Sequence, residues 1–235
     1  MSLPPPSPPP SPPPSRPPSP RLTWVAGGSG LVGRELLTQL ADEPVLALVR
    51  RPLAGCPASA LRQEALVDLL ALPADLPAPA RVFIALGTTM AQAGSQAAFR
   101  AVDFDAVLAV ARTARERGAT HCGVVSALGA DPASRVFYNR VKGEAEQALA
   151  SLSFRRLVIA RPSLLDGHRE ALGQPARTGE AWTLRVARPL APLIPKTWRP
   201  IAAERVARAL RLALAQGGPA VQVLESAAMQ TLGAP

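Results

Sequence analysis

The chain has 235 residues, of which 48% are hydrophobic, and a formal net charge of +9. This length suits one large or two small domains, and the apolar fraction is enough to bury a core. The charge comes from arginines scattered along a lysine-poor chain, so it predicts no nucleic-acid surface. No apolar run reaches the roughly 18 residues of a membrane span. The N-terminus has no secretory pattern, and Cys56 and Cys122 have no metal or redox spacing. Together these features predict a cytoplasmic protein without a metal site.

A proline-rich segment, residues 1–21, precedes the predicted domain. Its first twenty residues hold twelve prolines and no periodic apolar face. Such a composition cannot build a core and predicts a disordered tail with polyproline II tendency. The PxxP spacing suits a ligand of a proline-recognition domain, and the alternative is an extension without a role. Residues 22–235 then form the predicted domain.

From residue 22 onward, apolar strands alternate with helices. The sequence predicts strands at 22–27, 45–51, 64–68, 81–87, 121–130 and 154–163, and a last strand at 220–226. It predicts helices at 33–41, 99–119, 136–152 and 202–218. Strands that are apolar throughout are covered on both faces, as in a parallel sheet. The pattern therefore predicts a single α/β domain with a doubly wound parallel sheet of the Rossmann type.

An irregular, proline-rich flap is predicted at residues 164–201. Within it, residues 185–200 mix basic, proline and apolar side chains, including Trp198. Such a mixture suits contact with an anionic membrane or a partner protein. The alternative is a lid over a cofactor cleft, which the prolines favour because they interrupt any long amphipathic helix.

Three glycines follow the first predicted strand in a G-x-x-G-x-x-G pattern. Gly27 permits a tight turn, Gly30 lets a pyrophosphate approach the backbone, and Gly33 lets the next helix pack on the strand. The N-terminus of that helix offers free N–H groups to phosphates. The order strand, glycines, helix therefore predicts a dinucleotide site.

The end of the second strand bears on which dinucleotide binds. NAD sites place an acidic residue there for the ribose 2′-hydroxyl, whereas this chain has Arg50 and Arg51. A guanidinium pairs with a 2′-phosphate, and Arg34 can reach the same region. These arginines favour NADP(H) over NAD, and the alternative is that they are solvated surface residues.

The chain's single tyrosine, Tyr138, stands four residues before Lys142, one of only two lysines. This spacing puts both side chains on one helix face. A tyrosine of pKa ~10 is a slow acid, and a nearby ammonium lowers that value. Ser126 closes the fifth strand at the carboxyl edge, where α/β folds bind ligands. The three residues predict proton transfer to or from a substrate oxygen.

These motifs, in this order, resemble the short-chain dehydrogenase/reductase superfamily, and in particular the atypical branch that includes the Tat-interacting protein. The resemblance rests on ALGTTMAQAGSQAAFRAVD (85–103), VVSALGADPAS (124–134), FYNRVKGEAE (137–146) and RPSLLDGHRE (161–170). It covers nearly all of residues 23–226 and leaves the tail outside. Ala127 is a departure, since relatives often have a second serine there.

The resemblance implies a Rossmann domain with an NADP(H) site and assigns residues to it. Ser126, Tyr138 and Lys142 would be the catalytic triad. The implied cofactor-binding residues follow the strands in turn: Gly27, Ser29, Gly30, Leu31 and Val32 at the pyrophosphate, Arg50 and Arg51 at the 2′-phosphate, Asp68 and Leu69 at the adenine, Leu86, Gly87, Thr88 and Thr89 along the cofactor, and Pro162, Ser163 and Leu164 near the nicotinamide.

Several of these positions have a structural alternative. Ser126 would then cap a strand end, Asp68 would cap the following helix, and Thr88 and Thr89 would be loop residues. Asp103 lies either beside the cofactor groove or on a solvated helix face. His121 and His168 suit a core edge and a surface loop better than a catalytic role.

Three functions remain open from the sequence. The first is an NADP(H)-dependent oxidoreductase acting on a small carbonyl or alcohol, in which Ser126 polarises the carbonyl and Tyr138 supplies the proton. The second is an NADPH-binding sensor or assembly factor with a protein partner. The third is an epimerase or dehydratase that retains NAD and acts on a nucleotide sugar.

Overall fold

The computed structural model describes residues 21–54, 59–166, 195 and 197–234. Nearly all of the predicted tail, most of the predicted flap, Cys56 and His168 lie outside these residues. The division into tail, domain and flap therefore stays a prediction. None of the helices in the described ranges combines the length and apolar composition that crossing a bilayer requires.

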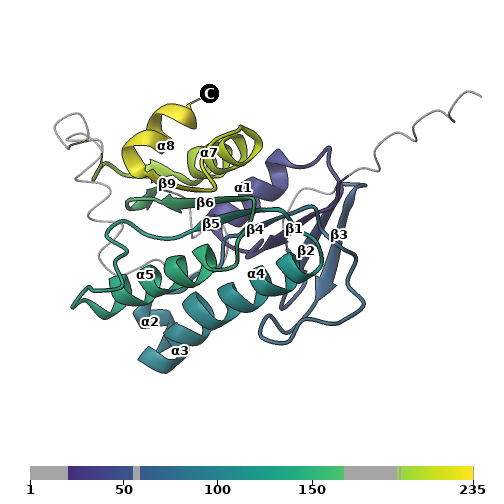
Figure 1. The fold of residues 1–235 in the computed structure, drawn as a ribbon, viewed down its shortest axis with the longest axis horizontal. Helices are drawn as coiled ribbons and strands as arrows, with labels where there is room; N and C mark the ends of the chain where they lie inside the picture. The colour runs from purple at the N-terminus through teal and green to yellow at the C-terminus, as the bar shows by residue number, and fades with distance from the viewer. Residues whose placement is uncertain (1–20, 55–58, 167–194, 196, 235) are drawn as a thin grey trace, which may run out of the picture.

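Seven parallel strands form the central sheet, in the order β3-β2-β1-β4-β5-β6-β9 (Figure 1). The order turns back between β1 and β4, which places the topological switch point of a Rossmann sheet there. The prediction of a doubly wound α/β fold is therefore confirmed. The strands are β1 (Thr23–Ala26), β2 (Val45–Val49), β3 (Arg62–Leu66), β4 (Arg81–Ile84), β5 (His121–Val125), β6 (Arg156–Arg161) and β9 (Val221–Glu225).

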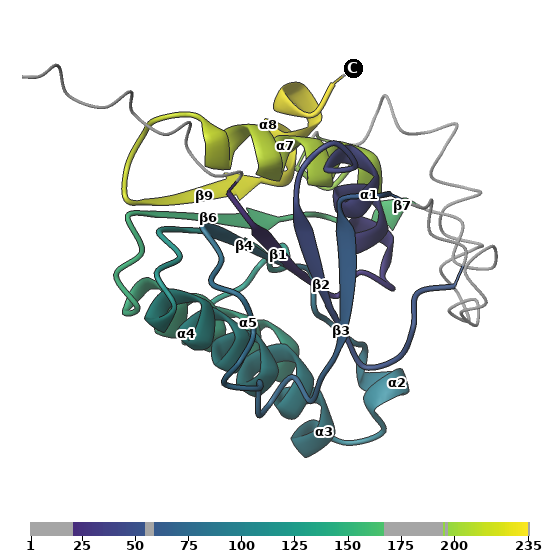
Figure 2. The same cartoon turned by 90° about the vertical axis from the view of Figure 1, so that its right-hand side faces the viewer.

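Helices cover both faces of the sheet, as the apolar strands require (Figures 1 and 2). One face packs against α1 (Leu31–Gln39), α7 (Ala203–Ala215) and α8 (Ser226–Leu232). The other packs against α4 (Val107–Glu116) and α5 (Phe137–Ala150). Trp24 and Phe83, both fully buried, point to opposite faces, so each face has its own hydrophobic core.

The helix predicted at 99–119 differs from a regular α-helix. It is built from α3 (Gln96–Arg100), a π-helical segment η1 (Ala101–Ala106) and α4. Short π-helical segments occur frequently at functional sites. Asp103 lies in η1 and is only 1% exposed, so it is not on a solvated face.

Four short elements were not predicted. They are α2 (Met90–Ala93), the two-stranded parallel sheet of β7 (Leu165–Asp166) and β8 (Ile201–Ala202), and α8. The β7–β8 pair joins the two ends of the predicted flap, with Ala202 one residue beyond it. Two-residue strands carry no periodicity, so pairing of this kind cannot be recognised from sequence.

Candidate functional site

Two glycines after β1 are required by the fold itself. Gly27 has a φ of +90°, and a Cβ there would lie 2.4 Å from the carbonyl oxygen of Ala85. A Cβ on Gly33 would lie 2.0 Å from the carbonyl oxygen of Gly27. Both distances are below any real contact, so the turn and helix α1 can approach β1 and β4 only without side chains at these positions.

Gly30 is different, because the protein leaves room beside it. Its backbone is extended, and a Cβ would come no closer than 3.4 Å to the Gly27 carbonyl oxygen. Gly30 is the N-cap of α1, which has no side-chain cap and no acidic residue in its first turn. Three neighbours predicted at the pyrophosphate, Ser29, Leu31 and Val32, lie in the same loop and first turn, and Val32 is buried in the core. An open helix N-terminus with glycine at its cap suits a phosphate that approaches the backbone.

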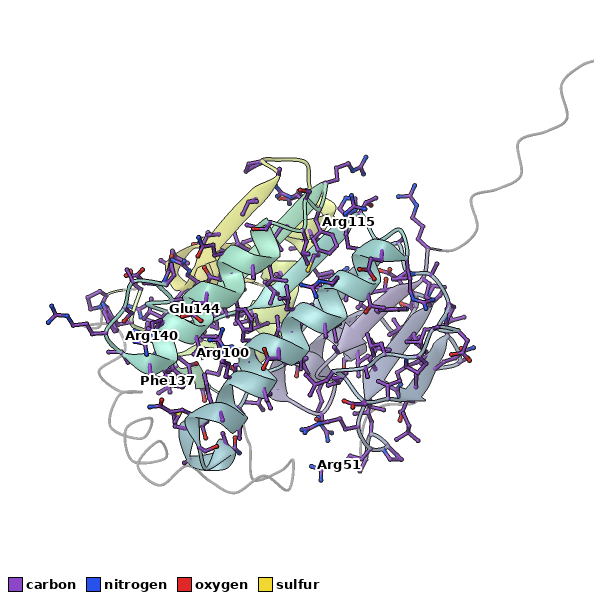
Figure 3. All side chains as sticks on the ribbon, turned by 60° about the horizontal axis from the view of Figure 1, so that its bottom comes forward. Arg51, Arg100, Arg115, Phe137, Arg140 and Glu144 are labelled. Atoms are coloured by element: carbon purple, nitrogen blue, oxygen red, sulfur yellow. The ribbon has the colours of Figure 1, made fainter. Side chains whose placement is uncertain are left out.

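The arginines predicted at the 2′-phosphate follow β2 directly. Arg50 and Arg51 are both exposed, and Arg51 extends from the body of the protein (Figure 3). Arg34 lies in α1, on the other side of the glycine turn. In sequence, Val49 at the end of β2 is followed directly by these two arginines and not by an acidic residue.

Residues after β3 contribute mainly to local structure. The Asp68 carboxylate accepts a hydrogen bond from the Leu70 backbone N–H at 2.9 Å, which closes a turn rather than capping a helix. Leu69 is buried in the core. Asp68 thus caps a turn through Oδ1, and its predicted contact with an adenine stays a prediction.

The loop after β4 lies next to Asp103 and Lys142. Leu86 is buried, and Thr89 caps α2 by accepting the Gln92 N–H at 3.1 Å. The Thr88 N–H donates to the Asp103 carboxylate at 2.9 Å. A Cβ on Gly87 would be 3.5 Å from an Asp103 oxygen and 3.8 Å from the Lys142 nitrogen. The segment predicted to run along a cofactor therefore lies beside the predicted catalytic lysine and is hydrogen-bonded to Asp103.

Lys142 and Asp103 form a buried ion pair. Lys142 Nζ lies 2.7 Å from Asp103 Oδ1, and the two side chains are 6% and 0% exposed. Burial alone would lower the pKa of Lys142, but the Asp103 carboxylate, Tyr138 and Glu146 outweigh it and raise that pKa. Lys142 is therefore an ammonium at neutral pH. Asp103 was not predicted as the partner of Lys142, because the two residues are 39 positions apart and η1 sets their contact.

Tyr138 stands one turn before Lys142 on α5. Its ring packs against Phe99 of α3, with 5.3 Å between ring centroids. Phe99 also contacts Phe137, so α3 and α5 meet through aromatic side chains. On the outside, Arg100 pairs with Glu144 at 2.5 Å across the same two helices (Figure 3). These contacts fix the part of α5 that holds Tyr138.

Ser126 follows β5 and is 9% exposed. Its hydroxyl donates a hydrogen bond to Glu146 of α5, and Glu146 in turn pairs with Arg161 at the end of β6 at 2.6 Å. A small cavity with room for about one water molecule lies among Ser126, Lys142, Asp103 and Glu146. Ser126 and Lys142 thus line the same cavity. Asp103 and Glu146, which were not predicted as site residues, line it as well.

Residues after β6 fasten the base of the predicted flap. The Ser163 hydroxyl donates to the Arg199 carbonyl oxygen at 2.5 Å and accepts from Ser226 at 3.0 Å. The Pro162 and Leu164 carbonyl oxygens accept backbone N–H groups from Leu128 and Ile201, each at 3.0 Å. Pro162, Ser163 and Leu164 therefore have a structural role in holding this segment. Contact with a nicotinamide would be a second role and stays a prediction.

Comparison with known proteins identifies close relatives. No family model matches the chain. The mitochondrial protein FMP52 of Eremothecium gossypii is 42% identical over 153 residues, which are 62% of this chain and 67% of that protein. The FMP52 protein of Coccidioides immitis is 36% identical over 166 residues, covering 63% and 67%. Both names include "mitochondrial", so the prediction of a cytoplasmic protein is wrong. A prediction made from missing secretory and membrane patterns gives no information on mitochondrial import.

Solved structures resemble the fold at low identity. MoeE5 in complex with UDP-glucuronic acid and NAD has a TM-score of 0.66 and 20% identity, covering 86% of this chain and 75% of that one. The UDP-N-acetylglucosamine 4-epimerase of Methanobrevibacter ruminantium has a TM-score of 0.65 and 17% identity, covering 87% and 76%. The aldohexose dehydrogenase of Thermoplasma acidophilum has a TM-score of 0.62 and 13% identity, covering 88% and 93%.

The sequence comparison identifies the family, and the structure comparison identifies the fold. The identity to the fungal proteins extends over about two thirds of their length, and the sheet order is that of dinucleotide-binding Rossmann enzymes. The chain belongs to the FMP52 family, and it shares the fold of the NAD-binding epimerase and dehydrogenase structures described above.

Proposed function

We propose that this protein is a nicotinamide-dinucleotide-dependent oxidoreductase that interconverts a carbonyl compound and an alcohol. The observation that carries the proposal is the buried ammonium of Lys142. It lies one helical turn from the only tyrosine, on the same cavity as Ser126, and beside the loop after β4. Core packing does not require a charged lysine whose side chain is only 6% exposed, whereas proton transfer by a tyrosine benefits from one.

The glycine turn, the open N-terminus of α1 and the loop after β4 would hold the cofactor. When bound, the nicotinamide supplies a hydride at C4. Tyr138 would give its phenolic proton to the carbonyl oxygen as that oxygen gains charge. The Lys142 ammonium would stabilise the phenolate that remains, and Asp103 would keep Lys142 in place. Solvent would then return the proton to Tyr138.

The activity is tested with a panel of aldehydes, ketones and quinones and both reduced cofactors. The proposal predicts turnover that disappears when the cofactor is omitted. Absence of turnover together with tight NADPH binding and a stable protein partner would support the sensor or assembly function instead. Release of NAD on denaturation, from protein purified without added cofactor, would support an epimerase or dehydratase.

A cofactor preference for NADP(H) is the finer part of the proposal. It rests on Arg50 and Arg51, which follow β2 where an NAD site has an acidic residue. MoeE5, the fold neighbour described above with a bound cofactor, contains NAD. The fold likeness thus favours NAD, and the residues after β2 favour NADP(H).

Changing Arg50 to aspartate should reverse this preference. The carboxylate repels a 2′-phosphate and accepts hydrogen bonds from a 2′-hydroxyl. We expect NADPH affinity to fall at least about ten-fold while NADH affinity stays the same or rises. Titration by nicotinamide fluorescence measures both, and Arg115→Asp, on the far end of α4, is the matched control. Equal effects on the two cofactors would show that Arg50 does not contact the 2′ position.

Two glycine substitutions should separate cofactor binding from folding. Gly30→Ala adds a methyl group where the protein has room, so the free energy of unfolding should change by less than about 1 kcal/mol. Cofactor affinity should nevertheless fall about ten-fold, because the methyl group occupies the phosphate's approach. Gly33→Ala adds the same group 2.0 Å from a carbonyl oxygen and should cost about 3 kcal/mol or more of stability. Unchanged cofactor affinity in a folded Gly30→Ala protein would contradict the phosphate site.

A further inference from the structure

Basic side chains gather at the edge of the sheet where the strands begin, opposite the edge that carries the glycine turn. Arg81, His121 and Arg156 are the first residues of β4, β5 and β6, and the strand register pairs each of them with the next. Register partners on neighbouring parallel strands lie about 5 Å apart and point to the same face of the sheet. The three side chains therefore form a row, and Arg155, which directly precedes β6, lies next to the middle one.

The two arginines of this row have partners within the protein. Arg81 forms an ion pair with Glu43. Arg156 is only 5% exposed and donates to the carbonyl oxygens of Pro219 and Ala213 at 2.5 and 2.9 Å. These contacts hold both guanidinium groups in place, so their positive charges stay at the start of β4 and β6, on either side of β5.

The start of β5 is fixed by backbone hydrogen bonds on both sides. The Thr120 N–H donates to the Ala80 carbonyl oxygen at 3.1 Å, and the Thr120 carbonyl oxygen accepts the Arg156 N–H at 3.2 Å. Arg155 Nη2 lies 3.5 Å from His121 Nε2. A guanidinium has donors only, so Nε2 is the acceptor, and the imidazole proton is on Nδ1, which lies 2.8 Å from Thr120 Oγ1. The Thr120 hydroxyl accepts there and keeps its own proton to donate.

His121 lies in a positive field. Burial of the ring lowers the pKa of His121, and four arginines lower it further. They are, from the largest effect to the smallest, Arg155, Arg21, Arg81 and Arg156. Among the described residues, Arg155 forms no ion pair with a carboxylate, and no acidic side chain raises the pKa of His121. This edge of the sheet therefore attracts an anion.

We propose that Thr120, His121 and Arg155 form a binding site for a phosphate group. The planar guanidinium of Arg155 binds two phosphate oxygens, and the Thr120 hydroxyl donates to a third. His121 takes up a proton from solvent at Nε2 and donates it to the same group, because the phosphate charge offsets the repulsion by the arginines. A phosphate, with nearly two charges and three acceptor oxygens, matches these donors better than a carboxylate.

This site is separate from the proposed chemistry. It lies where the strands begin, whereas the glycine turn and the loop beside Lys142 follow the strand ends. The inference therefore goes beyond the proposed function and does not depend on it. A phospholipid headgroup and a soluble phosphate compound share the chemistry that these residues recognise.

His121 can report on its own site, because the chain has only two histidines. In the His168→Gln protein, an NMR titration of the remaining imidazole gives the pKa of His121. Sulfate is the probe, since it has the shape and charge of a phosphate dianion and keeps that charge throughout the titration. Compared with sodium chloride at equal ionic strength, saturating sulfate should raise this pKa by about half a unit or more, which is about three-fold tighter binding to the protonated form. A pKa that is the same in both salts would overturn the proposal.

Arg155→Gln tests the role of the guanidinium. Arg155 is exposed, so the variant should fold. Loss of one neighbouring charge should raise the pKa of His121 in chloride, and the additional rise with sulfate should disappear. Arg135→Gln removes another exposed arginine, beyond the other end of β5, and should keep the full rise. A sulfate-dependent rise of the same size in Arg155→Gln and in the unchanged protein would overturn the proposal.

Two further measurements distinguish the sources of the phosphate. Inorganic phosphate should shift the His121 resonances as sulfate does. Vesicles of phosphatidylcholine, with and without phosphatidic acid, are then sedimented with the full-length protein. Sedimentation only with phosphatidic acid, lost in Arg155→Gln, would identify a lipid headgroup, and a shift with inorganic phosphate but no sedimentation would identify a soluble compound. Neither a shift nor sedimentation would overturn the proposal.

Discussion

Replacing Asp103 with leucine should lower the free energy of unfolding by about 3–5 kcal/mol. Lys142 is 6% exposed, and its ammonium lies 2.7 Å from the Asp103 carboxylate. Removal of the carboxylate leaves a buried charge without its counter-charge and also removes the acceptor of the Thr88 N–H. Urea denaturation followed by circular dichroism measures the change.

A double-mutant cycle supplies the control for this prediction. Lys142→Met removes the other charge, and the double variant Asp103→Leu/Lys142→Met has neither charge. The double variant should be less destabilised than the sum of the two single variants by at least about 1 kcal/mol, since the single variants each leave one charge unpaired. Strict additivity, or a change below about 1 kcal/mol in Asp103→Leu, would mean that the pair does not stabilise the fold.

Tyr138→Phe should reduce the rate of carbonyl reduction at least about hundred-fold, as expected for the loss of a general acid. The ring keeps its packing against Phe99, so stability and cofactor affinity should stay close to those of the unchanged protein. Single-turnover oxidation of bound NADPH, followed by absorbance, isolates the chemical step.

Phe137→Leu is the matched control for Tyr138→Phe. Phe137 precedes Tyr138 on α5 and also contacts Phe99, but it has no proton to give. It should lower stability without a hundred-fold loss of the single-turnover rate. Equal rates in Tyr138→Phe and the unchanged protein would show that the tyrosine is not the acid.

The sequence predicted the parts of this molecule that depend on neighbouring residues. Three patterns depend only on residues within one turn or one strand: the glycine spacing, the apolar strands, and the four-residue separation of Tyr138 and Lys142. Local geometry is therefore enough to predict the structure that each of them forms. The seven-strand sheet confirms the fold prediction, and the predicted helix at 99–119 is present but interrupted by the π-helical segment η1.

Contacts between distant segments could not be predicted in this way. Asp103 reaches Lys142, and Glu146 reaches Ser126, only after α4, α5 and β5 have packed together. Neither acid has a distinctive spacing to its partner, and a surface position was equally plausible for Asp103. The same limit applies to the flap base, where Ser163 meets Arg199 and Ser226 through tertiary packing.

The most direct test of this account is a titration of the purified protein with NADPH and NADH, followed by nicotinamide fluorescence. The account predicts saturable binding of one cofactor per chain, with NADPH the tighter of the two. Binding of neither cofactor at millimolar concentration would contradict the dinucleotide site, and with it the catalytic role given to Tyr138 and Lys142.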